Sequence, residues 1–198
     1  MKLVLATQNP KKLKEMNEIL SHLGVEVVSE AELGVRIEVE ETGETFTDNA
    51  RLKATAVMQA TGLSAVADDS GLCVDALNGG PGVYSVRFGG EGLDDKGRYT
   101  LLLEMLRGQT DRAAHFHTSI VCAFPNGDEL VCEGECPGTI AFAPMGEGGF
   151  GYDPVFFVPE LRKTFGQLTA EEKASVSHRG KALRAFAAAL DDYLKGNE

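Results

Sequence analysis

Residues 1–28, MKLVLATQNPKKLKEMNEILSHLGVEVV, decide the fold. The apolar run Leu3–Ala6 ends at Thr7, Gln8, Asn9 and Pro10, as a buried strand does where it breaks into a loop. Apolar residues then recur at helical spacing, at Leu13, Met16, Leu20 and Leu23, and Gly24 is a stop signal. Residues 25–28 predict a second strand. The order strand, loop, helix, strand predicts a βαβ unit.

The remaining sequence continues this alternation. Thr45 and Asp48 are spaced as a capping box and predict a helix to about Gln59, with Phe46, Ala50, Ala54 and Val57 toward the core. Leu63–Ala67 predicts a buried strand that runs directly into Asp68 and Asp69. Asn126-Gly127 between apolar runs predicts a hairpin of residues 115–124 and 129–135. We also expect a long loop at 78–97, helices at 99–107, 171–175 and 181–194, and a strand at 155–158.

Composition limits the classes of function. The 198 residues carry a net charge of −11, which argues against a nucleic-acid-binding protein. No stretch has the length of a membrane span, and the first apolar run is too short for a signal peptide. Four cysteines without a Cys-x-x-Cys pair predict buried free thiols and a reducing, cytoplasmic location. The absence of repeats and linkers favours one continuous domain over residues 1–198.

Two acidic positions are candidates for chemistry. Asp68 and Asp69 follow a buried strand, and adjacent carboxylates on extended backbone point in opposite directions. One of them can therefore face a ligand, as a Mg²⁺ ligand or a general base, while the other braces the structure. A turn in which both satisfy backbone amides is the alternative. Glu38, Glu40 and Glu41 form a second acidic segment, which is either a solvated loop or a source of a metal ligand.

Three further segments could contact a nucleotide. Residues Thr7–Lys12 join a strand to a helix N-terminus, which favours phosphate, although no Walker motif is present. Residues Gly146–Asp153 carry Phe150 and Tyr152 on a glycine-rich loop, either to stack on a base or to fill the core. His178 and Arg179 precede the last helix, where they could cap it and pair with acids, or donate to a purine carbonyl.

These segments, in this order, resemble the Ham1-like inosine triphosphate pyrophosphatases over nearly the whole chain. The resemblance is carried by Leu5–Asn9 with Lys12, Glu40–Gly43, Asn49-Ala50, Lys53-Ala54, Asp68–Leu72, Pro81–Ser85, Gly148–Pro154, Glu172-Lys173 and Ser177–Gly180. It implies an α/β fold with two lobes on a long bent mixed β-sheet, flanking helices, a central active-site cleft and a homodimer. It also implies Mg²⁺-dependent hydrolysis of ITP, dITP and XTP to the monophosphate and pyrophosphate, which clears deaminated purines from the nucleotide pool.

The resemblance also implies roles for single residues. Asp69 matches the proton acceptor that activates water and also contacts Mg²⁺; Glu40 matches the second metal carboxylate, with adjacent Glu41 as the open alternative. The substrate-binding positions implied are Thr7, Gln8, Asn9, Pro10, Lys11 and Lys12 for the phosphates, Lys53 and Ser70 for phosphate or sugar, and Phe150, Gly151, Tyr152, Asp153, Lys173, His178 and Arg179 for the base and its surroundings. The family usually has glycine where this chain has Gln8, so a positive φ at that position would strain the loop.

Overall fold

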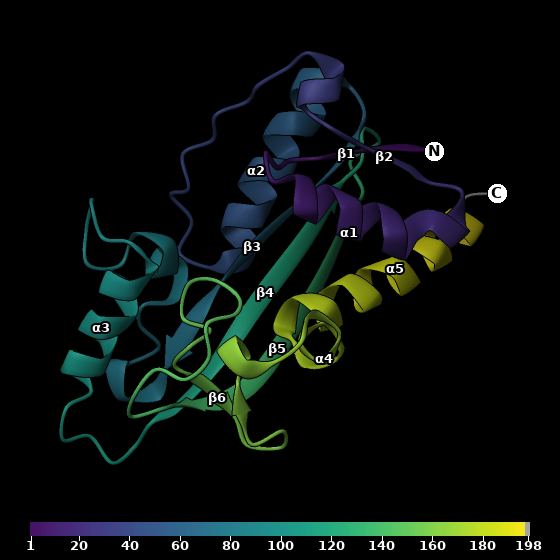
Figure 1. Ribbon diagram of the computed structural model, residues 1–198. Coiled ribbons are helices and arrows are strands. Elements are labelled where there is room, and N and C mark those ends of the chain that lie inside the picture. Colours follow the sequence, from purple (N-terminus) through teal and green to yellow (C-terminus); the bar gives the residue numbers. More distant parts are fainter. Residues whose placement is uncertain (197–198) are drawn as a thin grey trace. The chain divides into compact units, whose positions relative to one another are not determined.

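The computed structural model describes residues 1–196 and has an α/β fold built on one seven-stranded mixed sheet (Figure 1). The strands are β1 (Lys2–Leu5), β2 (Glu26–Ser29), β3 (Ser64–Val74), β4 (Ala113–Ala123), β5 (Glu129–Ile140), β6 (Phe156–Val158) and β7 (Lys163–Thr164), in the order β2-β1-β3-β4-β5-β6-β7. The α-helices are α1 (Pro10–Leu20), α2 (Phe46–Thr61), α3 (Asp95–Met105), α4 (Ala170–Val176) and α5 (His178–Gly196). The predicted α/β class with a mixed sheet and flanking helices is confirmed.

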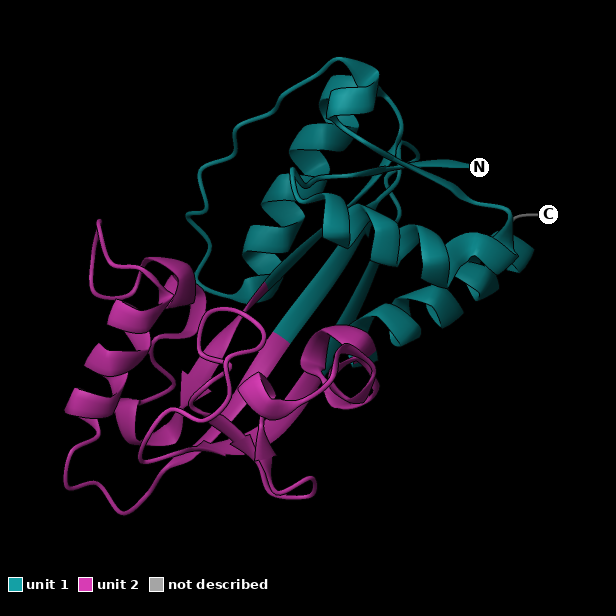
Figure 2. Ribbon diagram, viewed as in Figure 1, with its two compact units in different colours: residues 1–69, 118–134, 181–198 teal, residues 70–117, 135–180 magenta. Residues whose placement is uncertain are grey.

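The chain divides into two compact units (Figure 2). Unit 1 comprises residues 1–69, 118–134 and 181–198, and unit 2 comprises residues 70–117 and 135–180. The strands β3, β4 and β5 each contribute residues to both units, so three continuous strands run from one unit into the other.

The predicted βαβ unit opens unit 1. β1 pairs in parallel with β2 and also in parallel with β3. Between β1 and β2, α1 begins at Pro10, and the Asn9 side chain caps it by accepting a hydrogen bond from the Lys11 amide at 3.0 Å. The chain after α1 turns through Gly24, whose φ of 65° is the left-handed conformation that glycine adopts without strain. The strand–helix–strand prediction for residues 1–28 is confirmed.

The helix predicted after Thr45 is confirmed with its capping box. The Thr45 side chain accepts from the Asp48 amide, and the Asp48 carboxylate accepts from the Thr45 amide. The four predicted core positions, Phe46, Ala50, Ala54 and Val57, are buried. Asn49 and Lys53 lie four residues apart on another face of α2, where neighbouring side chains can act on one ligand.

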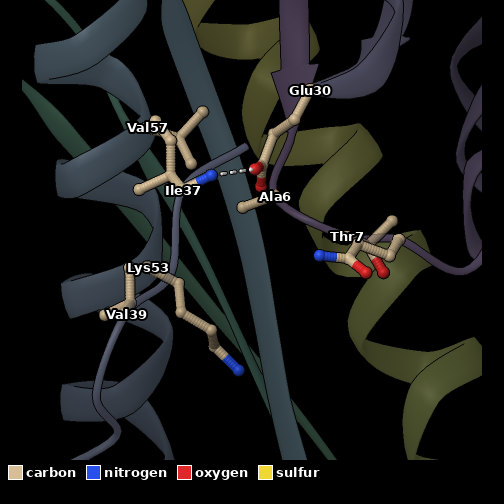
Figure 3. A pocket seen from close by; sticks show the side chains of 8 residues that line it. Ala6, Thr7, Glu30, Ile37, Val39, Lys53 and Val57 are labelled. Carbon is tan, nitrogen blue, oxygen red and sulfur yellow. Dashed lines mark hydrogen bonds between the residues drawn. The ribbon is translucent and has the colours of Figure 1, made fainter. Parts of the chain in front are cut away.

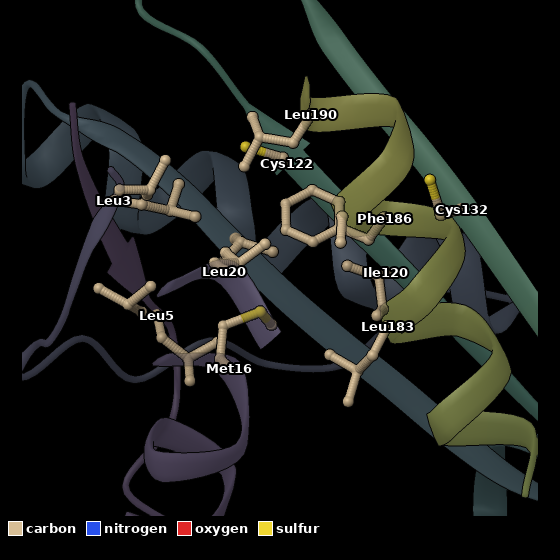
Figure 4. Close-up of a cluster of buried hydrophobic side chains, with 14 of the residues drawn as sticks. Leu3, Leu5, Met16, Leu20, Ile120, Cys122, Cys132, Leu183, Phe186 and Leu190 are labelled. Carbon is tan, nitrogen blue, oxygen red and sulfur yellow. The ribbon is translucent and has the colours of Figure 1, made fainter. Parts of the chain in front are cut away.

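Each unit has its own apolar core. In unit 1, Leu3 and Leu5 of β1 pack with side chains of α1 and α5, among them Met16, Leu20 and Phe186 (Figure 4). In unit 2, Leu102 of α3 packs with Phe116, Phe156 and Phe165. Burying one such side chain fully contributes about 1.5–3 kcal/mol. All four cysteines are free thiols, as predicted; Cys122, Cys132 and Cys136 are buried, whereas Cys73 is only half-buried, which corrects the prediction of burial for that residue.

The structure corrects several predicted boundaries. β3 does not end at Ala67 but continues through Asp68 and Asp69 to Val74. Lys12 and Lys53 pair with the two carboxylates, so the extended backbone can continue through these charged residues. α3 begins at Asp95 rather than Tyr99, since Asp94 caps it by accepting from the Gly97 amide, and a 3₁₀ helix, η4 (Gly82–Arg87), forms within the predicted loop.

The last helix also begins earlier than predicted. α5 includes His178 and Arg179 as its first residues instead of following them. The Ser177 hydroxyl, and not His178, accepts the hydrogen bond from the Gly180 amide at this helix start. Within residues 1–196, no helix combines the length and the apolar character needed to cross a bilayer.

Candidate active site

The two adjacent aspartates of β3 point to opposite sides, as the extended backbone requires. The Asp68 carboxylate accepts from Lys12 of α1 at 2.8 Å and is almost completely buried. The Asp69 carboxylate instead meets α2, where Asn49 Nδ2 lies 3.4 Å and Lys53 Nζ 3.2 Å from its oxygens. The two carboxylates therefore point to opposite sides of the strand, as predicted.

Lys53 is the centre of a small charged cluster in unit 1. Its ammonium lies 2.8 Å from Glu41 Oε1, 3.2 Å from Asp69 Oδ1 and 2.9 Å from the Asp68 carbonyl oxygen. The Lys53 and Asp69 side chains are only 19% and 14% exposed. Two carboxylates thus converge on one ammonium, and the cluster carries an excess of negative charge.

The pKa values of Asp69 and Lys53 in this cluster are both raised. Burial raises the pKa of Asp69 above its usual value, the Lys53 charge offsets part of that rise, and the Glu41 charge adds to it. Burial disfavours the charge on Lys53, but Asp69 and Glu41 outweigh it and raise the Lys53 pKa. Asp69 therefore binds a proton more readily than an exposed aspartate, which suits a general base.

The acidic segment before α2 supplies Glu41 to this cluster. Glu41 is half-buried against Lys53, whereas Glu40, the residue matched by the family resemblance, is exposed. The chain turns at Glu41, where the Thr42 amide donates to the Glu40 carbonyl at 3.1 Å, and the two neighbouring side chains differ in exposure. Of the two residues left open by the sequence, the structure brings Glu41 to Lys53 and the Asp69 carboxylate.

Residues of the predicted phosphate loop line a pocket of about 180 Å³ in unit 1 (Figure 3). Thr7, Gln8 and Lys53 supply its polar groups, and Ile37, Val39 and Val57 supply apolar wall. Glu30 also lines it, with its carboxylate bonded to the Ile37 amide at 3.0 Å. Gln8 does not have the positive φ of a substituted glycine, since Asn78 and Arg162 are the non-glycine residues with positive φ among residues 1–196.

The rest of the Thr7–Lys12 segment is ordered by local contacts. The Thr7 hydroxyl accepts from the Asn9 amide, the Asn9 side chain caps α1, and Lys12 is held by Asp68. Pro10 and Lys11 occupy the first turn of α1; Pro10 has no N–H, and the Lys11 amide donates to the Asn9 side chain. The segment thus joins a helix N-terminus to a pocket lined by the half-buried Lys53.

The oxygen atoms of this cluster fit a magnesium ion. Within the described residues, no three His, Cys, Asp or Glu side chains gather so as to hold a metal by themselves. Glu41 and Asp69 do bring two carboxylate oxygens to the same ammonium. Mg²⁺ is commonly bound by one or two carboxylates, with substrate phosphates and water completing its shell, so the donor set is suitable.

The second group of predicted site residues lies in unit 2, around an exposed aromatic ring. Phe150 is 77% exposed. The Lys173 ammonium lies 4.7 Å from its ring centroid and 5.2 Å from that of Phe165. An exposed ring beside a fixed cation is a suitable stacking surface for a planar heterocycle.

Asp153 holds the backbone that carries this ring. Its carboxylate is buried and accepts hydrogen bonds from the Phe150 amide at 2.9 Å and from Lys173. Burial raises the Asp153 pKa, and Lys173 and the Phe150 amide offset part of the rise. A Cβ at Gly149, whose φ is +80°, would lie 1.9 Å from Asp153 Oδ2, so glycine is required for the carboxylate to reach this position.

Of the other predicted base-contacting residues, His178 lies against the buried phenylalanines of unit 2. The His178 ring stacks on Phe116 with centroids 4.7 Å apart, and Phe116 stacks in turn on Phe165. Arg179 follows on α5 and is half-buried. Tyr152 instead lies in the unit 2 core, and its hydroxyl donates to the Ser85 carbonyl at 2.8 Å. Ser70 is half-buried on β3.

Asn49 is a site residue that the sequence prediction did not include. Its amide nitrogen donates to Asp69, and its amide oxygen accepts from Gly43 at 2.8 Å, which links the acidic segment to the carboxylate. Asn49 is fully buried despite its polarity. The sequence did carry a signal for Asn49: it lies one helical turn before Lys53, and two polar residues on one helix face can serve one site.

Comparison with known proteins gives a consistent result. The Ham1 family model matches residues 3–189. A dITP/XTP pyrophosphatase from Exiguobacterium is 50% identical over 196 residues, covering 99% of this chain and 100% of the relative. A dITP/XTP pyrophosphatase from Desulforamulus reducens is 54% identical over 186 residues, covering 93% of this chain and 92% of the relative.

Solved structures agree with the sequence relatives. The Ham1 protein of Staphylococcus aureus is 40% identical with a TM-score of 0.91, and each chain is fully covered by the other. A HAM1 protein from Coxiella burnetii is 42% identical with a TM-score of 0.93, covering 97% of this chain and 99% of that one. Near-complete coverage in sequence and in structure shows that this chain belongs to the Ham1 family.

Proposed function

We propose that this protein hydrolyses the non-canonical purine nucleoside triphosphates ITP, dITP and XTP to the monophosphate and pyrophosphate in a Mg²⁺-dependent reaction. The relatives named dITP/XTP pyrophosphatase, at 50% and 54% identity, support the reaction class. The single structural observation that carries the proposal is the half-buried Asp69 carboxylate, which lies beside Lys53 in a cluster with Glu41 and has a raised pKa. Its cellular role would be to remove deaminated purines from the nucleotide pool.

We assign the triphosphate mainly to residues of unit 1. Thr7, Gln8, Asn9, Lys11 and Lys12 bind phosphate oxygens through polar side chains or backbone amides, and Pro10, which can donate from neither, fixes the start of α1 beside them. Lys53 supplies a fixed positive charge from within the pocket that Thr7 and Gln8 line. Ser70, which follows Asp69 in the chain and belongs to unit 2, contacts phosphate or sugar.

Asp69 acts as the general base. It accepts a proton from a water molecule whose oxygen attacks the α-phosphorus; the bond from that phosphorus to the bridging oxygen breaks, and pyrophosphate leaves. Asn49 and Lys53 orient the carboxylate for this step. Lysine charge at the phosphates stabilises the negative charge that develops on their oxygens.

Asp69 and Glu41 would hold the magnesium ion, with Glu40 as the alternative to Glu41. Bound magnesium offsets phosphate charge during hydrolysis. The convergence of Glu41 and Asp69 on Lys53 supports Glu41, since Glu40 is exposed.

The purine base is assigned to residues of unit 2. Phe150 stacks on the base, Lys173 and Asp153 hold that ring in place, and Gly151 and Tyr152 complete the segment. His178 and Arg179 donate to the 6-carbonyl of hypoxanthine or xanthine. Adenine has an amino group at this position and leaves the donors unpaired, which gives strong discrimination.

We further propose that residues 1–198 work as one Ham1-like domain and that two copies form a homodimer in the cytoplasm. The family model spans residues 3–189 and therefore residues of both units. Tyr84 and Val86 of η4 are 59% and 79% exposed, which supports an apolar protein interface. The four free thiols are consistent with a reducing compartment.

Product analysis over a panel of nucleotides tests this function. ITP, dITP, XTP, GTP and ATP are each incubated with the protein in Mg²⁺ or in EDTA, and pyrophosphate and orthophosphate are quantified. We expect pyrophosphate from ITP, dITP and XTP in Mg²⁺ only, with little from ATP and GTP. Orthophosphate release would indicate stepwise phosphatase chemistry, and binding without turnover would indicate a nucleotide-binding regulator; either result, or equal rates for ITP and ATP, contradicts the proposal.

A further inference from the structure

The segment that carries Phe150 is also held by a carboxylate from a distant part of unit 2. The Gly151 amide donates to Asp95 Oδ2 at 2.7 Å, across 56 residues of sequence. Asp95 is the first residue of α3, immediately after the capping residue Asp94. A charge-assisted hydrogen bond of this length is among the stronger polar contacts that a loop can make.

The second oxygen of Asp95 is also engaged. Arg98 Nη1 lies 3.3 Å from Asp95 Oδ1, one helical turn further along α3. The Arg98 side chain is only 19% exposed, whereas Asp95 is 53% exposed. The largely buried guanidinium therefore fixes the direction in which the Asp95 carboxylate presents its other oxygen to Gly151.

These contacts fix the backbone of the segment but leave the Phe150 ring exposed. Asp153 accepts from the Phe150 amide, Asp95 accepts from the Gly151 amide, and the Tyr152 hydroxyl donates to the Ser85 carbonyl. Gly151 and Tyr152 are thus anchored to two distant parts of unit 2, and Phe150 is held by Asp153 within the same turn. The Phe150 side chain is nevertheless 77% exposed. A rigid backbone beneath a free ring is the arrangement that lowers the entropic cost of binding a planar ligand.

We propose that Asp95, oriented by Arg98, is a positioning residue that holds the Phe150 ring ready to stack on the substrate base. The identity of that ligand as a purine nucleotide rests on the proposed function; the rigidity of the segment does not. Asp95 acts through the Gly151 amide and has no part in the reacting atoms. Its loss weakens nucleotide binding and leaves the hydrolytic step largely intact.

A purely structural role for Asp95 makes a different prediction. An acidic residue in the first turn also stabilises a helix by interacting with its dipole. In that case Asp95→Ala lowers the stability of α3, and the mobility of residue 150 stays unchanged. Asp94→Asn is the matched control, because it removes one negative charge from the adjacent residue while asparagine remains a good N-cap.

The first experiment follows the mobility of position 150 without any substrate. The chain contains no tryptophan, so Phe150→Trp introduces a single indole reporter. Time-resolved anisotropy and acrylamide quenching are compared in this background for Asp95→Ala, Asp95→Asn, Arg98→Met and Asp94→Asn. We expect faster local motion and about twofold stronger quenching with Asp95→Ala, smaller changes with Asp95→Asn and Arg98→Met, and none with Asp94→Asn. Unchanged indole motion in Asp95→Ala or, if that variant does not fold, in both Asp95→Asn and Arg98→Met overturns the proposal.

The second experiment measures kinetics with the native Phe150. For ITP, Asp95→Ala is expected to raise KM about five- to tenfold while kcat changes less than about twofold, as loss of one charge-assisted contact predicts. Asp95→Asn should recover part of the loss, and Asp94→Asn should match the unsubstituted protein. A fall in kcat with unchanged KM contradicts the positioning role. If the unsubstituted protein hydrolyses no nucleotide, the proposed function fails, and the indole measurements still decide the role of Asp95.

Discussion

Asp69 of unit 1 is half-buried and Asp153 of unit 2 is buried; each lies beside a lysine, and desolvation raises the pKa of both. Their charged partners also differ. Asp69 shares Lys53 with a second carboxylate, Glu41, so its cluster has excess negative charge. Asp153 has Lys173 and a backbone amide as donors, which hold an aromatic residue in place. Each carboxylate thus accepts two hydrogen bonds, and the difference lies in the donors: those of Asp69 are side chains of α2, on a lysine that a second carboxylate shares, whereas those of Asp153 hold the backbone of a neighbouring loop.

The largest expected effect is that of Asp69→Asn. This variant keeps the size of the side chain but removes the proton acceptor, and we expect kcat for ITP to fall about 10³-fold or more. The measurement is steady-state pyrophosphate release at saturating ITP.

Asp68→Asn is the control for this prediction, because Asp68 lies next to Asp69 but faces Lys12. It should affect KM and stability more than kcat. Near-normal turnover in Asp69→Asn, or equal losses of kcat in the two variants, would contradict the assignment of Asp69 as the general base.

The next effect is that of Asp153→Asn. This change leaves Lys173 without its buried counter-charge and weakens the acceptor for the Phe150 amide. We expect kcat/KM for ITP to fall about tenfold to a hundredfold, mostly through KM, with reduced discrimination against ATP. Initial rates over a range of ITP and ATP concentrations provide the test. A loss confined to kcat would mean that Asp153, like Asp69, takes part in the reaction, which would contradict the distinction between the two aspartates.

A smaller effect is expected from Gly149→Ala. Its methyl group would collide with the Asp153 carboxylate and its φ is positive, so we expect a loss of about 1–3 kcal/mol in the free energy of unfolding. Gly151→Ala is the matched control, since Gly151 has a φ of +60° but no atom within 4 Å of the added Cβ. Chemical denaturation should rank Gly149→Ala as clearly less stable than Gly151→Ala, and equal stabilities would contradict the crowding at Asp153.

The smallest effect concerns pH. In the metal-free protein, ¹³C NMR of aspartate carboxyls should show Asp69 and Asp153 titrating above the usual value of 3.8. Because folding raises these pKa values, the folded state binds the proton more tightly than the unfolded chain. The resulting stability is present below pH 3.8 and is lost as the pH rises through the folded pKa. Asp153→Asn should remove its part of that pH dependence, and an Asp153 that titrates below 3.8 would contradict its burial.

The sequence was sufficient for features that depend on local spacing. The capping box of Thr45 and Asp48, the βαβ unit and the opposite directions of Asp68 and Asp69 all follow from backbone geometry over a few residues. The family resemblance supplied the α/β fold class with its mixed sheet, which backbone periodicity alone does not specify.

Features that depend on long-range contacts were beyond local reasoning. β3 extends past Asp69 because Lys12 and Lys53, which are far away in sequence, neutralise its carboxylates. Whether Glu40 or Glu41 joins the Lys53 cluster depends on which of the two side chains faces α2, and the order of residues in the sequence does not show which way each side chain points. The anchor from Asp95 to Gly151 likewise joins segments that no spacing rule connects.

The measurement that most directly tests the division between Asp69 and Asp153 is calorimetric binding, in Mg²⁺, of an ITP analogue with a non-hydrolysable α–β bridge to the unsubstituted protein and the two asparagine variants. We expect Asp69→Asn to bind the analogue within about tenfold of the unsubstituted protein, and Asp153→Asn to bind it more weakly than Asp69→Asn does. The reverse order, with Asp153→Asn binding normally and Asp69→Asn failing to bind, would contradict the account.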